Sequence, residues 1–226
     1  MNSSRTPELE WLDDVPVNPD FADPYFARTN GLAESRHVFL AGNTLPERFL
    51  PDFHIAELGF GTGLNLIAAL IAFRAAKVPG RLGYTAFEAF PMNRSDMARA
   101  LSAFPEVRDT AAPILDWWHD PAVPLELTDL RADVILGDVN DTLPGWRGTA
   151  DAWFLDGFAP ARNPGMWGAS LMQSVADHTA PGGTFATYTA AGHVRRALAE
   201  AGFTVERCPG YGRKRHMSLG VLKAPQ

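Results

Sequence analysis

The chain has 226 residues, of which 46% are hydrophobic and 20% charged, a balance typical of a folded globular protein. Its net charge of -6 is unfavourable for general nucleic-acid binding. The longest strongly apolar run has ten residues and Cys208 is the single cysteine, so we expect a soluble cytoplasmic protein with no membrane helix, intrachain disulfide or cysteine-based zinc cluster.

Residues 1–50 show no regular hydrophobic periodicity and contain four prolines between positions 7 and 24. This composition predicts an extended or hairpin arm, followed by a short helix over 34–40. We therefore expect an N-terminal arm over 1–50 that packs on a single domain over 51–226.

From residue 53 onward, predicted strands alternate with predicted helices. Strands are expected over 53–60, 81–90, 150–158 and 184–189, with two short strands over 124–130 and 132–138 that can form a hairpin. Helices are expected over 64–77, 93–104, 165–179 and 191–201, with 105–122 partly helical and a turn at 181–183. The alternation predicts an α/β fold whose parallel sheet has helices on both faces.

The last two predicted strands, 203–208 and 216–222, are joined by a segment too short for a crossover helix. We therefore expect the last strand to be antiparallel. Because ligands of parallel α/β sheets bind beyond the carboxyl ends of the strands, polar residues at those ends are the candidate site.

A glycine-rich segment follows the strand over 53–60. Its glycines have the spacing G-x-G-x-G, which is neither the dinucleotide G-x-G-x-x-G nor a P-loop. Glycines there let the backbone approach a ligand closely, although tight strand-to-helix turns also use glycine for their own geometry. The preceding acidic residue favours the ligand interpretation. The residues expected to contact the ligand are Glu57, Gly59, Phe60, Gly61, Thr62, Gly63 and Asn65.

Two further strands end in a carboxylate. Glu88 lies 25 residues after Gly63, where a carboxylate can accept both ribose hydroxyls of an adenosine; the alternative is a solvated or ion-paired side chain. Asp138 can accept a hydrogen bond from an adenine amino group, or it can cap the following turn.

The strand over 150–158 ends in Asp156-Gly-Phe-Ala-Pro. Asp156 can orient an amine and can also contact the ligand of the glycine-rich segment. Phe158 can stack on a planar group, with Pro160 beside it. The alternative is a turn aspartate with Phe158 in the core. We interpret this segment as a substrate site, with Asp156 as the catalytic residue.

Two other regions supply candidate substrate contacts. Tyr25 of the arm can close over the site or simply pack. Residues 191–216 hold six Lys/Arg against two Asp/Glu, and this basic end can bind phosphates or be a solvated face. The basic candidates are Arg195, Arg213, Lys214 and Arg215. We expect no metal, because the six histidines lack ligand spacing such as H-x-x-x-H, and no hydrolase, because there is no G-x-S-x-G.

The order of these strand ends resembles class I S-adenosylmethionine-dependent methyltransferases. The strings ELGFGTGLN, DAWFLDGFAPARNPGMW and GYGRKRHMSLG, with DPYFARTNGLAESRHVFLAGN, are similar to the methyltransferase domain of the MnmC family of bifunctional tRNA-modifying proteins. The resemblance extends from about residue 9 to residue 222. It implies a Rossmann-like fold with a mostly parallel, seven-stranded sheet.

The resemblance also implies an activity. That domain uses S-adenosylmethionine to methylate the 5-aminomethyl group of a wobble (2-thio)uridine in the tRNA anticodon loop, giving 5-methylaminomethyl-(2-thio)uridine. In the bifunctional proteins an FAD-dependent oxidase domain follows. This chain has no second glycine-rich dinucleotide loop, so we expect no FAD here and an oxidase partner in trans or in a longer protein.

Three other functions stay open. The chain can methylate a small-molecule amine, or bind S-adenosylmethionine without catalysis as the partner of an oxidase. A nicotinamide-dependent dehydrogenase ranks last, because its second and third glycines would need one more residue between them.

Overall fold

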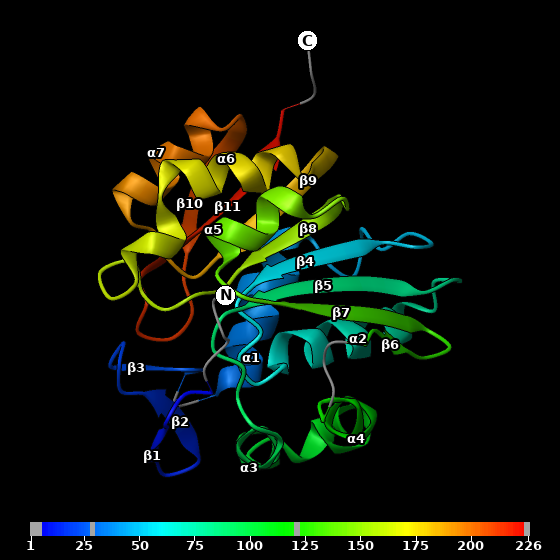
Figure 1. Cartoon of the computed structure of the whole chain (residues 1–226). Coiled ribbons are helices and arrows are strands. Elements are labelled where there is room, and N and C mark those ends of the chain that lie inside the picture. Colours follow the sequence, from blue (N-terminus) through cyan, green and yellow to red (C-terminus); the bar gives the residue numbers. More distant parts are fainter. Residues whose placement is uncertain (1–5, 28–29, 120–122, 224–226) are drawn as a thin grey trace.

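The computed structural model describes residues 6–27, 30–119 and 123–223, and it contains a large sheet and a small one. In the large sheet the strands lie in the order β10-β11-β9-β8-β4-β5-β7-β6 (Figure 1). In chain order they are β4 (His54–Leu58), β5 (Leu82–Glu88), β6 (Leu125–Glu126), β7 (Leu130–Leu136), β8 (Ala150–Leu155), β9 (Thr179–Thr187), β10 (Phe203–Pro209) and β11 (His216–Leu222).

The strand directions confirm a mostly parallel sheet. β7, β5, β4, β8 and β9 pair in parallel, and β11 inserts antiparallel between β9 and β10. The described residues form eight strands in this sheet instead of the expected seven, because the two-residue β6 pairs antiparallel with β7 as a hairpin.

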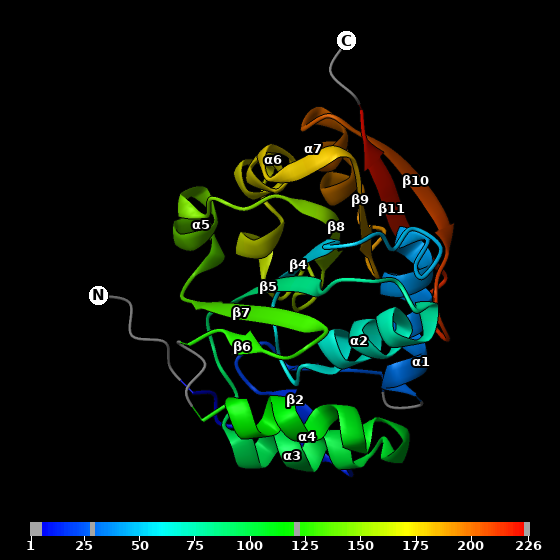
Figure 2. The same cartoon turned by 90° about the vertical axis from the view of Figure 1, so that its right-hand side faces the viewer.

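Helices cover both faces of the sheet, as the alternation predicts (Figure 2). One face carries α1 (Gly31–Ser35), α2 (Leu64–Ala76), α3 (Arg94–Ser102) and α4 (Arg108–Trp117), and the other carries α5 (Val139–Thr142), α6 (Ala169–Asp177) and α7 (Gly192–Glu200). Strand β4 serves both layers, since successive side chains point to opposite faces. Ile55 packs in the core on the α2 side, whereas Ala56 and Leu58 pack in the core on the α6 side.

Short helical segments complete the layers: η1 (Arg36–Leu40, a π-helix) and the 3-10 turns η2 (Ala41–Asn43), η3 (Pro105–Val107), η4 (Leu143–Gly145) and η5 (Pro164–Trp167). The N-cap of α3 is Asn93, whose side chain accepts a hydrogen bond from the Asp96 amide. In the described chain, no helix is long and apolar enough to cross a bilayer.

Two predicted elements differ from the structure. The helix expected over 165–179 is interrupted at Gly168, whose extended backbone separates η5 from α6. The turn expected at 181–183 is wrong, because β9 begins at Thr179 and runs through these residues. Its pairing with β8 shifts there, so that Ala150 pairs with Thr179 and Ala152 with Thr184. The Pro-Gly-Gly segment is therefore an irregular bulge inside a strand.

The N-terminal segment forms the small antiparallel sheet of β1 (Glu10–Leu12), β2 (Val15–Asn18) and β3 (Asp23–Pro24). Figure 1 shows this sheet on the same side of the molecule as the loop after β8 and the loop between β10 and β11. Farther along, Leu32, Val38 and Phe39 are buried in the main core. The small sheet thus lies at the edge of the large sheet where β4, β5, β7 and β8 end.

Candidate active site

A cavity of about 400 Å³ opens at the carboxyl edge of the parallel strands. Its volume falls within the range of small-molecule sites. Its walls come from the loops after β4, β5, β7 and β8, from the arm, and from the loop between β10 and β11. The predicted residues that line it are Tyr25, Gly59, Phe60, Gly61, Thr62, Asn65, Glu88, Asp138, Asp156, Phe158 and Lys214.

Other predicted residues are described by the structure but lie outside the cavity wall. Glu57 is completely buried beneath it, and Gly63 is the N-cap of α2. Pro160 follows the wall residue Ala159 in the chain without lining the cavity itself. The remaining three are Arg195 on α7 and the exposed Arg213 and Arg215.

The glycine-rich loop has a backbone that requires glycine. Gly59 has φ +85°, and a Cβ there would lie 2.4 Å from the carbonyl oxygen of Asp156. Gly61 has φ +53°, and a Cβ would lie 3.1 Å from the Tyr25 ring. Side chains at these two positions would combine left-handed backbone strain with contact against the neighbouring wall.

Glu88 holds this loop in place from the end of β5. Its Oε2 accepts hydrogen bonds from the amides of Phe60 at 2.8 Å and Gly61 at 2.9 Å, and its Oε1 accepts one from Phe90 at 2.7 Å. Glu88 also lines the cavity, so the same carboxylate can order the loop and face a ligand. Because the Glu88 carboxylate is hydrogen-bonded to backbone amides, the alternative of a solvated or ion-paired side chain does not apply.

Glu57 and Asp156 are joined by one amide. The Nδ2 of Asn65 donates to Glu57 Oε1 and to Asp156 Oδ2, each at 2.7 Å. The Ser35 hydroxyl donates to Asn65 Oδ1 at 2.5 Å, which fixes the direction of the amide. The Tyr84 hydroxyl donates to Glu57 Oε2 at 2.7 Å. Glu57 therefore supports the site from below, through Asn65.

The two carboxyl groups have pKa values displaced upward. Burial raises the pKa of Glu57 well above its usual value, and the nearby Asp156 adds to the effect. Burial likewise raises the pKa of Asp156 to about 7, while the hydrogen bond from Asn65 and the charge of Lys214 oppose the rise. A carboxyl group that titrates near neutral pH at the end of a strand is suited to proton transfer or to binding a cation.

Aromatic rings from the arm and from the loop after β8 form one wall. Phe158 stacks on Phe21 with ring centres 4.5 Å apart and meets Tyr25 edge-on at 5.2 Å. Asp23 Oδ2 accepts a hydrogen bond from the Ala159 amide at 2.8 Å, which ties the arm to this loop. Phe158 thus lies in the cavity wall, where the loop after β8 meets the arm.

Asp138 has the capping geometry that the sequence left open. It is the N-cap of α5, and its Oδ1 accepts hydrogen bonds from the Asn140 amide and side chain, each at 2.9 Å. It is also a cavity residue. Capping and ligand contact are compatible here, because a carboxylate has two oxygens and several acceptor sites.

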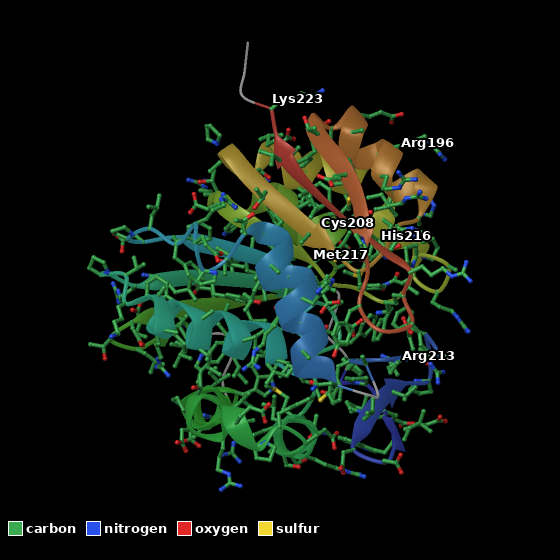
Figure 3. The ribbon with its side chains drawn as sticks, turned by 180° about the vertical axis from the view of Figure 1, so that it is seen from behind. Arg196, Cys208, Arg213, His216, Met217 and Lys223 are labelled. Carbon is green, nitrogen blue, oxygen red and sulfur yellow. The ribbon has the colours of Figure 1, made fainter. Side chains whose placement is uncertain are left out.

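The basic residues separate into two groups. Lys214 lines the cavity, where its Nζ lies 2.9 Å from Glu34 Oε1. Arg213 is exposed beside the small N-terminal sheet, and Arg196 is exposed on α7 at the same side of the molecule (Figure 3). Both arginines are thus outside the cavity wall, on the side of the molecule where the parallel strands end.

Sequence reasoning missed a number of cavity residues, among them Phe21, Asp23, Glu34 and Tyr188. Asp23 and Glu34 stand in the string DPYFARTNGLAESRHVFLAGN, which carried the family resemblance, and Tyr188 directly follows the end of β9. Glu34 falls in a stretch that the sequence predicts as an ordinary helix. Across the described ranges, no group of three or more His, Cys, Asp or Glu is placed to hold a metal ion.

Comparison with known proteins identifies the family. A family model described as S-adenosyl-L-methionine-dependent methyltransferase matches residues 106–223, more than half of the chain. The chain belongs to this family. The matched region contains the loops with Asp138 and Asp156, and the glycine-rich loop precedes it.

Individual relatives of the methyltransferase are longer. It is 44% identical over 233 residues to a protein of Chromohalobacter salexigens named tRNA 5-methylaminomethyl-2-thiouridine biosynthesis bifunctional protein MnmC. It is 45% identical to the protein of the same name from Caulobacter vibrioides. These alignments cover 97% and 95% of this chain but 33% and 38% of the relatives. The chain therefore spans little more than a third of their length.

A solved structure shares the fold. The crystal structure of MnmC2 from Aquifex aeolicus superposes with a TM-score of 0.77 and 24% identity, covering 98% of this chain and 72% of that one. The agreement extends over almost the whole methyltransferase.

The residues present fit S-adenosylmethionine. The backbone of the glycine-rich loop leaves no room for side chains at Gly59 and Gly61, and the cavity beside it is large enough for a small molecule. Glu88 is placed to accept ribose hydroxyls, and Asp138 lies one strand farther along the same edge. A half-buried carboxylate such as Asp156 complements a cationic ligand.

Proposed function

We propose that this methyltransferase transfers the methyl group of S-adenosylmethionine to the amine of 5-aminomethyl-(2-thio)uridine at the wobble position of tRNA. The observation that carries the proposal is the placement of Asp156, held by Asn65 beside the glycine-rich loop in the wall of the cavity. The names of the relatives, which match nearly the whole chain at 44–45% identity, support the same product.

Each part of the cavity receives a role in this proposal. The loop over 59–63 and Glu88 hold the sugar and amino-acid parts of the cofactor, and Asp138 faces its adenine. When bound, S-adenosylmethionine supplies an electrophilic methyl group. Phe158 and Tyr25 offer an aromatic surface on which a uracil ring can stack.

Asp156 acts on the amine. An amine attacks only as the neutral base, so an incoming ammonium must first lose a proton. A carboxylate whose pKa is about 7 can accept that proton at neutral pH. Once that proton has passed to solvent, the ionised carboxylate can stabilise the positive charge that develops on the amine nitrogen. Most of the remaining acceleration comes from holding the nitrogen in line with the methyl group.

Arginines around the cavity, exposed at Arg213 and Arg215 and half-buried at Arg195, give the RNA its contacts. Arg213, Arg215 and Arg195 lie outside the cavity, where phosphates of a splayed-out anticodon loop can approach. The word bifunctional in the relatives' name supports a second activity in the complete system. We propose that an FAD-dependent oxidase, as a further domain or as a separate protein in the cytoplasm, delivers the amine substrate.

The test is methyl transfer from radiolabelled S-adenosylmethionine to tRNA that carries 5-aminomethyluridine, with fully modified tRNA as the matched control. We expect label on the aminomethyl tRNA alone. Asp156→Ala should lower the rate on the order of a hundredfold while isothermal titration still detects cofactor binding.

Other outcomes separate the alternatives. Labelling of small amines but not of tRNA would replace the RNA substrate with a small-molecule one. Cofactor binding with no transfer to either class would indicate a non-catalytic binding partner. Equal labelling of both tRNA samples would place the methyl group elsewhere on the RNA.

A further inference from the structure

Lys214 differs from its basic neighbours in where its ammonium group lies. Its Nζ is 2.9 Å from Glu34 Oε1 and 4.0 Å from the centre of the Tyr188 ring. Lys214, Glu34 and Tyr188 all line the cavity that contains Asp156. Although the Lys214 side chain is 45% exposed, the carboxylate and the aromatic ring hold its ammonium group at the cavity, because both partners attract its charge.

The ring beneath Lys214 is itself attached to the catalytic loop. The Tyr188 hydroxyl donates a hydrogen bond of 2.5 Å to the carbonyl of Gly157, the residue after Asp156. Glu34 belongs to α1, whose Ser35 donates to Asn65, and Asn65 donates to Asp156. Tyr188 is thus bonded to the residue next to Asp156. Glu34 precedes Ser35, which is linked to Asp156 through Asn65.

The charges that face Asp156 come from several elements. Glu34 of α1 and Asp23 of β3 raise the pKa of Asp156 after burial, and Glu57 of β4 and Tyr188 after β9 also face it. Lys214 is the cationic member of this group and lowers that pKa. Arg213 and Arg215 flank Lys214 in the chain but lie outside the cavity.

We propose that Lys214 is a positioning residue of the methyl-transfer site, which favours the ionised form of the Asp156 side chain among acidic neighbours, and that it is not a phosphate ligand of tRNA. The link to catalysis rests on the proposed function, whereas the effect on Asp156 does not. Substrate phosphates are left to Arg213 and Arg215. The loop over 210–215 therefore contributes to both the chemistry and the binding of RNA.

The first experiment measures Asp156 directly in the ligand-free full chain. The protein is labelled with [13C]aspartate, Asp156→Asn assigns the carboxyl signal, and the signal is titrated with pH by NMR. Lys214→Met should raise the Asp156 pKa by about 1 unit, Lys214→Arg should leave it within a few tenths, and Arg213→Met should not move it. Lys214→Gln is a second neutral variant, should the methionine variant fold poorly.

Two results would overturn the proposal: an Asp156 titration unmoved by both neutral variants, or the same shift from Arg213→Met. Because this measurement needs no methyl transfer, it remains decisive if the wild-type chain does not label tRNA. A wild-type chain that does not label tRNA would count against the proposed function and not against this role of Lys214.

The second experiment separates positioning from RNA binding in the active enzyme. For Lys214→Met we expect the acidic limb of the kcat profile to move to higher pH, with KM for tRNA within twofold of wild type. A phosphate ligand would behave oppositely, with a raised KM and an unmoved limb, and that outcome would contradict the proposal. Lys214→Arg should restore the wild-type limb.

Discussion

At the scale of single residues, the site depends on one amide that satisfies two carboxyl groups. Asn65 uses both hydrogens of its Nδ2, one for Glu57 and one for Asp156, and Ser35 prevents the amide from turning over. Removing a partner of a buried carboxyl group leaves it unsatisfied, which costs more than the bond contributes. Asn65 therefore fixes the two carboxyl groups beside the glycine-rich loop. Keeping both groups away from water costs stability of the folded state.

That cost predicts a pH-dependent stability. Burial raises the pKa of Asp156 from 3.8 to about 7, so the folded state favours the protonated form. The corresponding stabilisation is complete below about pH 4 and is lost as the pH rises through 7. In the ligand-free protein, Asp156→Asn should raise the free energy of unfolding relative to wild type at pH 8, on the order of 2–4 kcal/mol, and by much less at pH 5.

Denaturant unfolding at the two pH values measures this difference. Asp20→Asn, at an exposed position of the arm, is the matched control and should follow the wild-type pH dependence. An equal effect of Asp156→Asn at pH 5 and pH 8 would contradict the prediction.

At the scale of elements, the position of the loop between β4 and α2 in the cavity wall depends on how the strands of the sheet pair. Gly59 lies against the backbone of the Asp156 loop because β4 and β8 are parallel neighbours, with Leu58 paired to Leu155. The glycine thus sets how closely two strand ends approach. Its backbone conformation therefore also determines the shape of the candidate site.

Gly59→Ala should disturb this junction. The new Cβ would lie 2.4 Å from the Asp156 carbonyl oxygen at a residue with φ +85°. We expect cofactor affinity to fall at least tenfold, with a loss of stability of about 1–3 kcal/mol from backbone strain. Isothermal titration with S-adenosylmethionine and thermal unfolding measure the two effects.

The matched control is Gly182→Ala. Gly182 has φ +74°, but a Cβ there meets nothing within 4 Å, and it lies in the bulge at the start of β9. It should lose about 1 kcal/mol of stability and no affinity. If both variants weakened cofactor binding equally, the close approach at Gly59 would not be the cause.

At the scale of the whole molecule, an acidic protein concentrates basic residues at one edge. The net charge is -6, yet residues 191–216 carry six Lys/Arg and two Asp/Glu. The fold brings part of this segment, with Arg196 and Arg213, to the side where the parallel strands end (Figure 3). An approaching polyanion is thus attracted mainly to the edge that contains the cavity.

This asymmetry predicts where salt acts. The double variant Arg213→Glu/Arg215→Glu should weaken tRNA binding and reduce the slope of log K against log salt by about 0.7–0.9 for each lost phosphate contact. Lys77→Glu is the control, since exposed Lys77 ends α2 at the opposite edge of the sheet. Fluorescence anisotropy over a salt series measures both. Equal weakening by the two changes would show that only the net charge matters.

The sequence by itself determined the features that depend on local chain geometry. The alternation of strands and helices and the antiparallel last strand follow from periodicity and loop length. The placement of Glu88, Asp138 and Asp156 at one edge follows as well, because parallel strands necessarily end together.

Only the tertiary structure decided what each side chain does at that edge. Glu57 lies beneath the cavity because Tyr84 and Asn65, from a neighbouring strand and helix, enclose it. The Lys214 ammonium group lies at the cavity although its side chain is 45% exposed, because Glu34 and Tyr188 meet it from segments 180 and 26 residues away. Such contacts depend on packing between elements, and residue patterns along one chain carry no record of which distant side chains will meet.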